Sequence, residues 1–468
     1  MKNSDFTRSC SFFALFFGNL PLNLRLLLFF VTYLASILCR RGFMKLNFGR
    51  HSFLKNVVTL MSGTVVAQML TVLASPVLSR LFSPEDFALL ASFTSVTSLC
   101  VVFCSGKYEM AILLPEKESD ARNILRLSLL VCAATCCILP AIIIGIGRFN
   151  EAFNALVSNG LVIVAVMFVL CSNMCESFRY YFLRRKQFKA ISSRTVVVSL
   201  TTVCLNLICG YFFYSHKIFV ISTTAAQIVA LILFLFLFFR LFGKEKQPWS
   251  LGAIKQFLVR YWKFPAFTMS GQLLNSLTLN MPILVLANYF SSTSIGLYAF
   301  VYKIASLPMT VIGTNVTQVF MQRISQSSPS EQKKIFLKTS AALFLLILPP
   351  AVIGVIFAPQ LFSFIFGEKW IPAATLARLM APMLVIRFTT TPVTAVYNIK
   401  EKNFLSFVFQ VVRLVLMIVG FVIALSLKCS FEITIFINSI VLIIFYILGY
   451  VTAFFLCDVK GKNEKNSI

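Results

Sequence analysis

Charged side chains are scarce in this sequence. Asp, Glu, Lys and Arg together make up 12% of the 468 residues, about half the share that is usual in soluble domains, whereas 58% of the residues are hydrophobic. A soluble fold could not cover so much apolar side chain with so little charge. The sequence therefore excludes a soluble domain and predicts an all-α integral membrane protein, for which the bilayer itself is the apolar solvent.

Groups that bind metals or perform catalysis are also scarce. His51 and His216 are the two histidines, and the 13 cysteines form no paired CxxC motif. No metal site and no cofactor are therefore predicted. Most cysteines, such as Cys171 and Cys175, lie inside apolar runs and are interpreted as small packing residues. Because no nucleophile–base pair is found either, the sequence does not indicate an enzyme.

The few charges are strongly biased toward one sign. There are 42 Lys and Arg residues against 16 Asp and Glu, which gives a net charge of +26. Such a charge would suit nucleic acid, but the basic residues occur in short clusters between apolar runs. That distribution is typical of the cytoplasmic loops of membrane proteins. Nucleic acid is therefore not expected as a partner.

Twelve apolar segments are long enough to cross about 30 Å of hydrocarbon at 1.5 Å per residue. Alternate loops between them carry 26 and 4 basic residues, which places the start of the first segment and the C-terminus in the cytoplasm. The predicted spans lie near residues 57–81, 87–105, 124–147, 156–182, 195–214, 218–242, 265–288, 294–322, 336–358, 372–396, 404–427 and 432–457.

Two halves of the chain resemble each other. Met61-Ser62-Gly63 recurs 208 residues later as Met269-Ser270-Gly271, and Ile138-Leu139-Pro140 recurs after 209 residues as Ile347-Leu348-Pro349. Six predicted spans separate the matched positions, so the halves share one orientation. Parallel repeats of this kind are typical of alternating-access transporters with a site between the two lobes. We expect one six-helix lobe at 44–250 and a second at 251–468; an old duplication in a channel or structural protein is the alternative.

The segments that follow Phe53 resemble a known family. LMSGTVVAQMLTVLASPVLSRLFSPEDFALLASF and GKYEMAILLPEKESDA, with FSSTSIGLYAF at 290–300 and LFSFIFGEKW at 361–370, resemble the polysaccharide-biosynthesis flippases. These Wzx-type translocases of O-antigen and capsule repeat units belong to the multidrug/oligosaccharidyl-lipid/polysaccharide exporter superfamily. The resemblance covers about residues 44–457, and its motifs mark mainly turns and helix ends.

The resemblance implies a function as well as a fold. The expected substrate is an undecaprenyl-pyrophosphate-linked oligosaccharide, which is moved from the cytoplasmic to the periplasmic leaflet of the bacterial inner membrane. The expected partners are membrane lipid and the polymerase and chain-length regulator of the same pathway. The protein itself is expected to be a monomer.

Basic residues inside the predicted spans are the candidate binding residues, because a charge at the centre of a bilayer costs at least about 2.5–3.5 kcal/mol. Lys303 and Arg387 lie roughly 13 and 22 Å from the periplasmic ends of their spans, and Arg413 lies roughly 14 Å from a cytoplasmic end. Arg378 and Arg80 are shallower. Guanidinium groups suit phosphate because they offer paired donors. We interpret Lys303, Arg387 and Arg413 as lining a cationic cavity for pyrophosphate and acidic sugars.

Each candidate has a structural interpretation as well. Long basic side chains can extend to the membrane surface and bind nothing, and we favour this reading for Arg80, Arg126 and Arg179. The seventh span contains the polar residues Gln272, Asn275 and Asn280. We expect them either to face sugar hydroxyls or to hydrogen-bond neighbouring helices.

Glu176 is the one acidic residue well inside a span. It lies three residues before Arg179, so an intrahelical ion pair is the favoured interpretation. The alternative is a site for a coupling ion, either Na⁺ or H⁺.

Other transporter classes fit the residues less well. A cation-coupled multidrug exporter of the same superfamily is the alternative function, but it needs membrane-embedded carboxylates, and Glu176 alone is available. A major-facilitator sugar transporter would carry a Gly–Asp–Arg-type motif between spans two and three, where this chain has GKYEMAILLPEKESDAR.

Residues 1–43 do not match the family pattern. Segment 11–39 is apolar but contains Pro21 and Arg25, and it lacks a small-residue cleavage site. Met44 begins the basic sequence MKLNFGRHSFLKN, which suits the cytoplasmic start of the first span. We expect Met44 to be the initiator and residues 1–43 to be a hydrophobic extension that is not translated. N-terminal sequencing of the native protein should begin at or just after Met44, and a sequence that begins at Met1 or Lys2 would refute this.

Overall fold

The computed structural model describes residues 52–213, 215–243, 251–325, 327–400 and 402–457. The expectations for residues 1–43 and for a start at Met44 lie outside this range. The first half of the chain forms α3 (Ser52–Leu81), α4 (Pro84–Ser105), η1 (Tyr108–Leu113), α5 (Glu118–Gly147), α6 (Glu151–Ser158), α7 (Val162–Arg184), α8 (Phe188–Phe212), α9 (Ile218–Phe242) and α10 (Leu251–Arg260).

The second half follows a similar order of long and short helices. It forms η2 (Phe264–Met269), α11 (Ser270–Leu286), α12 (Ser292–Ala305), η3 (Met309–Gly313), α13 (Thr314–Ser325), α14 (Pro329–Ile356), α15 (Ala358–Phe366), η4 (Glu368–Trp370), α16 (Ile371–Thr389), α17 (Val393–Ile399), α18 (Asn403–Ser426) and α19 (Phe431–Leu456). The order of α3, α4, α5 and the short helix α6 in the first half is therefore repeated by α11, α12, α14 and the short helix α15 in the second. We call α6 and α15 the crossing helices.

Ten helices among the described residues are long and apolar enough to cross a membrane. They coincide with ten of the twelve predicted spans, and the protein is an all-helical, multi-pass membrane protein. The other two predicted spans, 265–288 and 294–322, contain irregular helix. Pro265 and Pro308 lie at the start of π-helical turns, η2 and η3, because proline lacks the N–H that an α-helix requires. The uninterrupted α-helices there, α11 and α12, have only 17 and 14 residues.

Two predicted boundaries were wrong. The span predicted at 156–182 begins later, at Val162, because Gly160 adopts a left-handed conformation (φ 67°) that separates α6 from α7. The span predicted at 372–396 ends at Thr389, and α17 begins after Pro392. Each error lies at a turn next to an apolar segment, where hydropathy does not change.

The same capping chemistry begins the second helix of each half. Ser83 caps α4: its hydroxyl accepts from the Asp86 N–H, and the Asp86 carboxylate accepts from the Ser83 N–H at 2.8 Å. Ser291, which lies 208 residues later, caps α12 by accepting from the Ser294 N–H. The repeat found in the sequence thus corresponds to equivalent helix starts.

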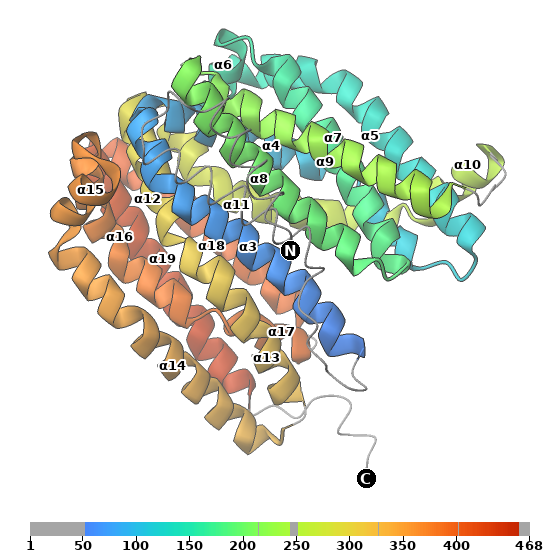
Figure 1. Ribbon diagram of the computed structural model, residues 1–468. Helices are drawn as coiled ribbons and strands as arrows, with labels where there is room; N and C mark the ends of the chain where they lie inside the picture. The colour runs from blue at the N-terminus through green and yellow to red at the C-terminus, as the bar shows by residue number, and fades with distance from the viewer. Residues whose placement is uncertain (1–51, 214, 244–250, 326, 401, 458–468) are drawn as a thin grey trace, which may run out of the picture.

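The helices form two groups that converge near α6 and α15 and diverge toward α10 in one group and the far end of α14 in the other (Figure 1). Helices α4 and α12 pack closely at the converging end. An aromatic cluster joins the halves there: the Phe87 ring lies 4.9 Å from that of Phe219, 5.1 Å from that of Phe300 and 5.1 Å from that of Trp370. Each edge-to-face pair adds about 0.5–1.5 kcal/mol beyond its buried area.

Gly296 is required for the contact between α4 and α12. A Cβ atom at this position would lie 1.7 Å from the Pro84 carbonyl oxygen. We predict that Gly296→Ala lowers the stability by about 1–3 kcal/mol, since helix backbones must move apart. Thermal unfolding in detergent measures this, with Gly354→Ala as the control because a Cβ at Gly354 meets no atom within 4 Å. Equal melting temperatures for the two variants would contradict the prediction.

Candidate functional site

Three adjoining cavities lie at or next to the boundary of the two halves. The largest has a volume of about 240 Å³ and lies between α4, α11 and α12. It shares Phe87 and Lys303 with a cavity of about 20 Å³ next to α3, and these two cavities lie between the halves. The third, also of about 20 Å³, shares Tyr298 and Tyr302 with the largest, and the described residues that line it all belong to the second half, on α11, α12, α16, α18 and α19.

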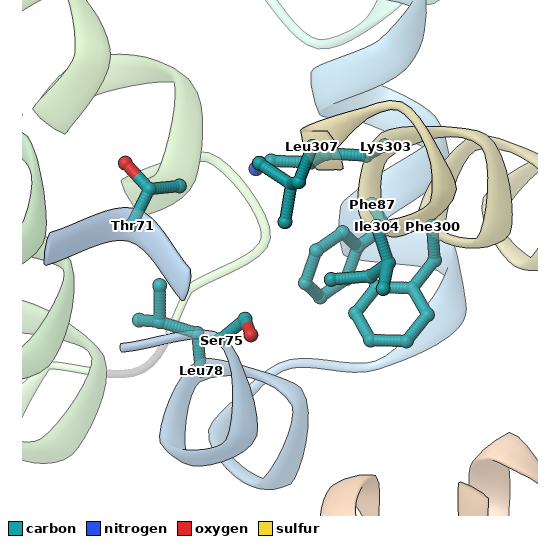
Figure 2. A pocket seen from close by; sticks show the side chains of 8 residues that line it. All are labelled: Thr71, Ser75, Leu78, Phe87, Phe300, Lys303, Ile304 and Leu307. Carbon is teal, nitrogen blue, oxygen red and sulfur yellow. The ribbon is translucent and has the colours of Figure 1, made fainter. Parts of the chain in front are cut away.

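Lys303 lies where the first two cavities meet. Figure 2 shows its side chain extending from α12 toward α3, where Thr71 and Ser75 line the opposite wall. The Nζ atom lies 5.9 Å from the centre of the Phe87 ring and 5.8 Å from that of Phe219. Among the described residues, no carboxylate pairs with it. The aromatic faces attract the ammonium group only weakly, so Lys303 can still bind an anion.

Arg387 and Arg413 both line the third cavity. Arg387 on α16 donates from Nη1 to the Tyr302 hydroxyl at 2.5 Å, and its guanidinium lies 5.3 Å from the centre of the same ring. Arg413 on α18 donates from Nη2 to Asn275 Oδ1 at 3.2 Å, whereas its buried Nε has no hydrogen-bond partner among the described residues. The two arginines are therefore held in place by neutral side chains.

The polar residues of the seventh span have different surroundings. Asn275 holds Arg413, as described. Asn280 lines the largest cavity and donates to Ser98 Oγ of α4 at 2.8 Å, so it also joins the two halves. Gln272 lies outside the three cavities, and its Nε2 contacts the Met110 sulfur at 3.9 Å.

Two predicted binding residues lie away from the cavities. Arg378 donates to the Val355 and Ile356 carbonyls at 2.8 and 3.1 Å and so caps the C-terminus of α14. Arg80, at the C-terminus of α3, donates to the Phe364 carbonyl at 2.9 Å. Neither arginine lies beside Lys303, Arg387 or Arg413, because both guanidinium groups bond carbonyls near helix ends instead.

Glu176 lies in a separate ion-pair network in the first half. Its carboxylate accepts from Arg179 Nε at 2.6 Å and lies 3.3 Å from Arg194 Nη1, and Arg194 in turn contacts Gln227. The intrahelical pair expected with Arg179 is therefore present. Arg194 is a second partner that sequence spacing could not indicate, since it belongs to the next helix.

The motif GKYEMAILLPEKESDA connects α4 to α5 through the short helix η1 and ends in the first turn of α5. Gly106 and Lys107 both adopt left-handed conformations, with φ of 54° and 58°, and Lys107 Nζ lies 3.5 Å from Glu109 Oε1. Burial raises the pKa of the Glu109 carboxyl, and the ion pair with Lys107 opposes this shift. The motif is thus explained by the geometry of η1 and does not contribute to the cavities.

With this geometry established, comparison with known proteins assigns the family. A family model described as "Polysaccharide biosynthesis protein" matches residues 77–375. The chain belongs to this family. The teichuronic acid biosynthesis protein TuaB of Bacillus subtilis is 23% identical over 251 residues, which are 52% of this chain and 50% of TuaB. The match therefore spans only about half of that relative.

Solved structures show the same fold. The lipid II flippase MurJ, in an inward closed conformation, superimposes with a TM-score of 0.65 at 11% identity, over 86% of this chain and 90% of MurJ. An inward-facing multidrug resistance MATE transporter of the MOP superfamily gives 0.60 at 16% identity, over 86% of this chain and 96% of that one. At these identities the likeness concerns the fold alone. The chain is thus a member of a polysaccharide-biosynthesis family that shares the fold of these membrane transporters.

Three tyrosines that line the cavities were not among the candidate binding residues predicted from the sequence. Tyr298 and Tyr302 lie on the same helix as Lys303 and are one turn apart, and Tyr446 of α19 lines the third cavity with Arg387. The spacing of the two tyrosines was a usable signal, because residues four apart share one face of a helix. Tyr446 had no such signal, since its place in the cavity depends on how α19 packs against α16.

Glu176 offers a test that separates an ion-pair role from an ion-coupling role. We predict that Glu176→Gln lowers stability by about 1 kcal/mol, because Arg179 and Arg194 lose their carboxylate while water still screens both. Transport in cells should retain its dependence on pH and Na⁺. Thermal unfolding and complementation at several pH values measure the two effects, with the exposed Glu116→Gln as control. Loss of transport at unchanged stability would favour the coupling interpretation instead.

Proposed function

We propose that this protein moves undecaprenyl-pyrophosphate-linked oligosaccharide units from the cytoplasmic to the periplasmic leaflet, for the synthesis of O-antigen, capsule or another surface polysaccharide. Transport occurs by alternating access through the cavities between the halves. The observation that carries the proposal is the charge of these cavities. Lys303 lines the two cavities between the halves, and Arg387 and Arg413 line the adjoining cavity within the second half. None of the described lining residues is a carboxylate.

The chemistry of the lining residues supports an anionic, sugar-bearing substrate. The ammonium group of Lys303 and the guanidinium groups of Arg387 and Arg413 attract phosphate oxygens, and guanidinium groups can bind them through paired donors. Tyr298, Tyr302 and Tyr446 add apolar ring faces and hydroxyls, which suit the alternating apolar and polar surfaces of a sugar. A drug cation would be repelled by the same three charges, which argues against the multidrug exporter as the alternative.

The proposal includes an arrangement in the bacterial inner membrane. The two irregular spans, 265–288 and 294–322, complete twelve spans in two six-helix lobes, at 44–250 and 251–468. The regular helices that these irregular turns interrupt, α11 and α12, line the largest cavity. The excess of basic residues in alternate loops places the C-terminus in the cytoplasm. In this orientation the end with α6 and α15 faces the periplasm, and the halves diverge toward the cytoplasm.

The cavity volume requires a change of conformation. A volume of about 240 Å³ is smaller than the roughly 300–1,000 Å³ of typical small-molecule sites, and an oligosaccharide needs more. The halves must therefore separate further before the substrate enters. The polyprenyl chain remains in the lipid, because its apolar surface gains nothing from entering a cationic cavity.

The test is complementation of a strain that lacks the gene. Deletion should abolish the surface polysaccharide on gels and cause lipid-linked units to accumulate inside. Wild type should restore the polysaccharide, whereas Lys303→Ala, Arg387→Ala and Arg413→Ala should each reduce it at least about tenfold, since a charge-assisted hydrogen bond contributes about 1.5–3 kcal/mol.

Arg378→Ala is the matched control, because Arg378 bonds helix carbonyls of its own half outside the cavities. It should restore the polysaccharide when present at wild-type levels in the membrane. Full rescue by the three cavity variants would show that their charges bind no substrate. Unchanged polysaccharide in the deletion strain, without a redundant flippase, would remove the proposed function.

A further inference from the structure

The two short crossing helices, α6 and α15, lie at the end of the molecule where the halves converge (Figure 1). Each belongs to one half, and each is hydrogen-bonded to the first long helix of the other half. Helix α15 and η4 bond the C-terminus of α3, and the start of α6 bonds the C-terminus of α11. The cationic cavities lie farther in, behind these contacts.

The contacts at the C-terminus of α3 come mainly from η4. Trp370, which is fully buried, donates from Nε1 to the Ser79 carbonyl at 2.8 Å. Lys369 donates from Nζ to the carbonyls of Arg80 and Phe82 at 3.1 and 2.5 Å. Three carbonyls that α3 leaves unbonded at its end are thus bonded by the second half.

The contacts at the C-terminus of α11 come from the start of α6. Asn150 donates from Nδ2 to the Leu284 carbonyl at 2.9 Å, and the Glu151 N–H donates to Asn288 Oδ1 at 2.7 Å. Donors of the first half thus bond acceptors at the C-terminus of α11, just as donors of the second half bond acceptors at the C-terminus of α3.

The two sets of contacts are related by the internal repeat. Arg80 and Asn288 are separated by the 208-residue offset of the sequence repeat, and each bonds the crossing helix of the opposite half. Glu85 and Thr293 are separated by the same offset and are hydrogen-bonded to each other. The approximate twofold axis therefore passes between Glu85 and Thr293, with one set of contacts on each side.

The chemistry of these contacts suits a closure that must open repeatedly. The acceptors are the carbonyls at helix ends, and water can replace the protein donors when the halves part. No backbone hydrogen bond within a helix has to break. Exchanging these particular hydrogen bonds for bonds to water therefore costs little.

We propose that α6 and α15–η4 form a reciprocal latch that closes this end of the transporter, and that its two sides open together. The latch rests on the proposed alternating access, since it holds the state in which the cavities are shut off from the end that carries α6 and α15. Because each side of the latch connects the same two rigid halves, weakening one side favours separation of both.

The experiment is hydrogen exchange by mass spectrometry on the full-length protein in lipid nanodiscs. Asn150→Ser keeps a side-chain oxygen that caps α6 but removes the donor to Leu284. Exchange should become about two- to tenfold faster in residues 366–371, on the other side of the latch, as expected for the loss of one hydrogen bond that holds both halves. Lys369→Met should likewise accelerate exchange at residues 284–290.

Asn159→Ser is the matched control, because Asn159 follows the same short helix and donates to the Ala155 carbonyl of its own half at 2.8 Å. It should leave residues 366–371 unchanged. Acceleration by Asn150→Ser that stays within residues 148–160, or that extends equally through α9 and α19, would overturn the latch. This measurement needs no substrate, so failure of the latch and failure of the flippase assignment are distinguishable.

Discussion

The cost of an unpaired charge in hydrocarbon is the constraint on which the rest of the structure depends. The chain carries 42 basic residues and 16 acidic ones, so most cations cannot find a carboxylate. Those near helix ends bond carbonyls, as Arg80 and Arg378 do. The Glu176 carboxylate forms ion pairs with Arg179 and Arg194. The deep cation Lys303 instead faces cavities at the boundary of the halves, and Arg387 and Arg413 face the adjoining cavity within the second half.

The irregular helices adjoin the same cavities. A π-helical turn is a rare interruption of an α-helix. The π-helical turns η2 and η3 occur at the start of α11 and just after α12, the two helices that line the largest cavity together with α4. The helices that face lipid elsewhere, such as α9 and α19, have no such interruption among the described residues.

The two ends of the molecule differ in what holds them. At the end with α6 and α15, close packing at Gly296, the aromatic cluster around Phe87 and hydrogen bonds to helix carbonyls join the halves. Toward the other end, helices of the two halves diverge (Figure 1). An alternating-access transporter needs such a difference between its ends, because one end must close while the other opens. The contacts that close an end must be numerous, and each must be easy to exchange for a contact with water.

The sequence by itself predicted the membrane class, the positions of ten long helices and the family, because these depend on local hydropathy and on short motifs at helix ends. It also selected Lys303, Arg387 and Arg413 as deep cations, and the structure places all three in cavity walls. Only the tertiary structure decided that Arg80 and Arg378 bond helix ends, that Arg194 joins Glu176, and that Tyr446 lies beside Arg387. These facts depend on which helices pack together over long sequence separations, and hydropathy carries no information about such pairings.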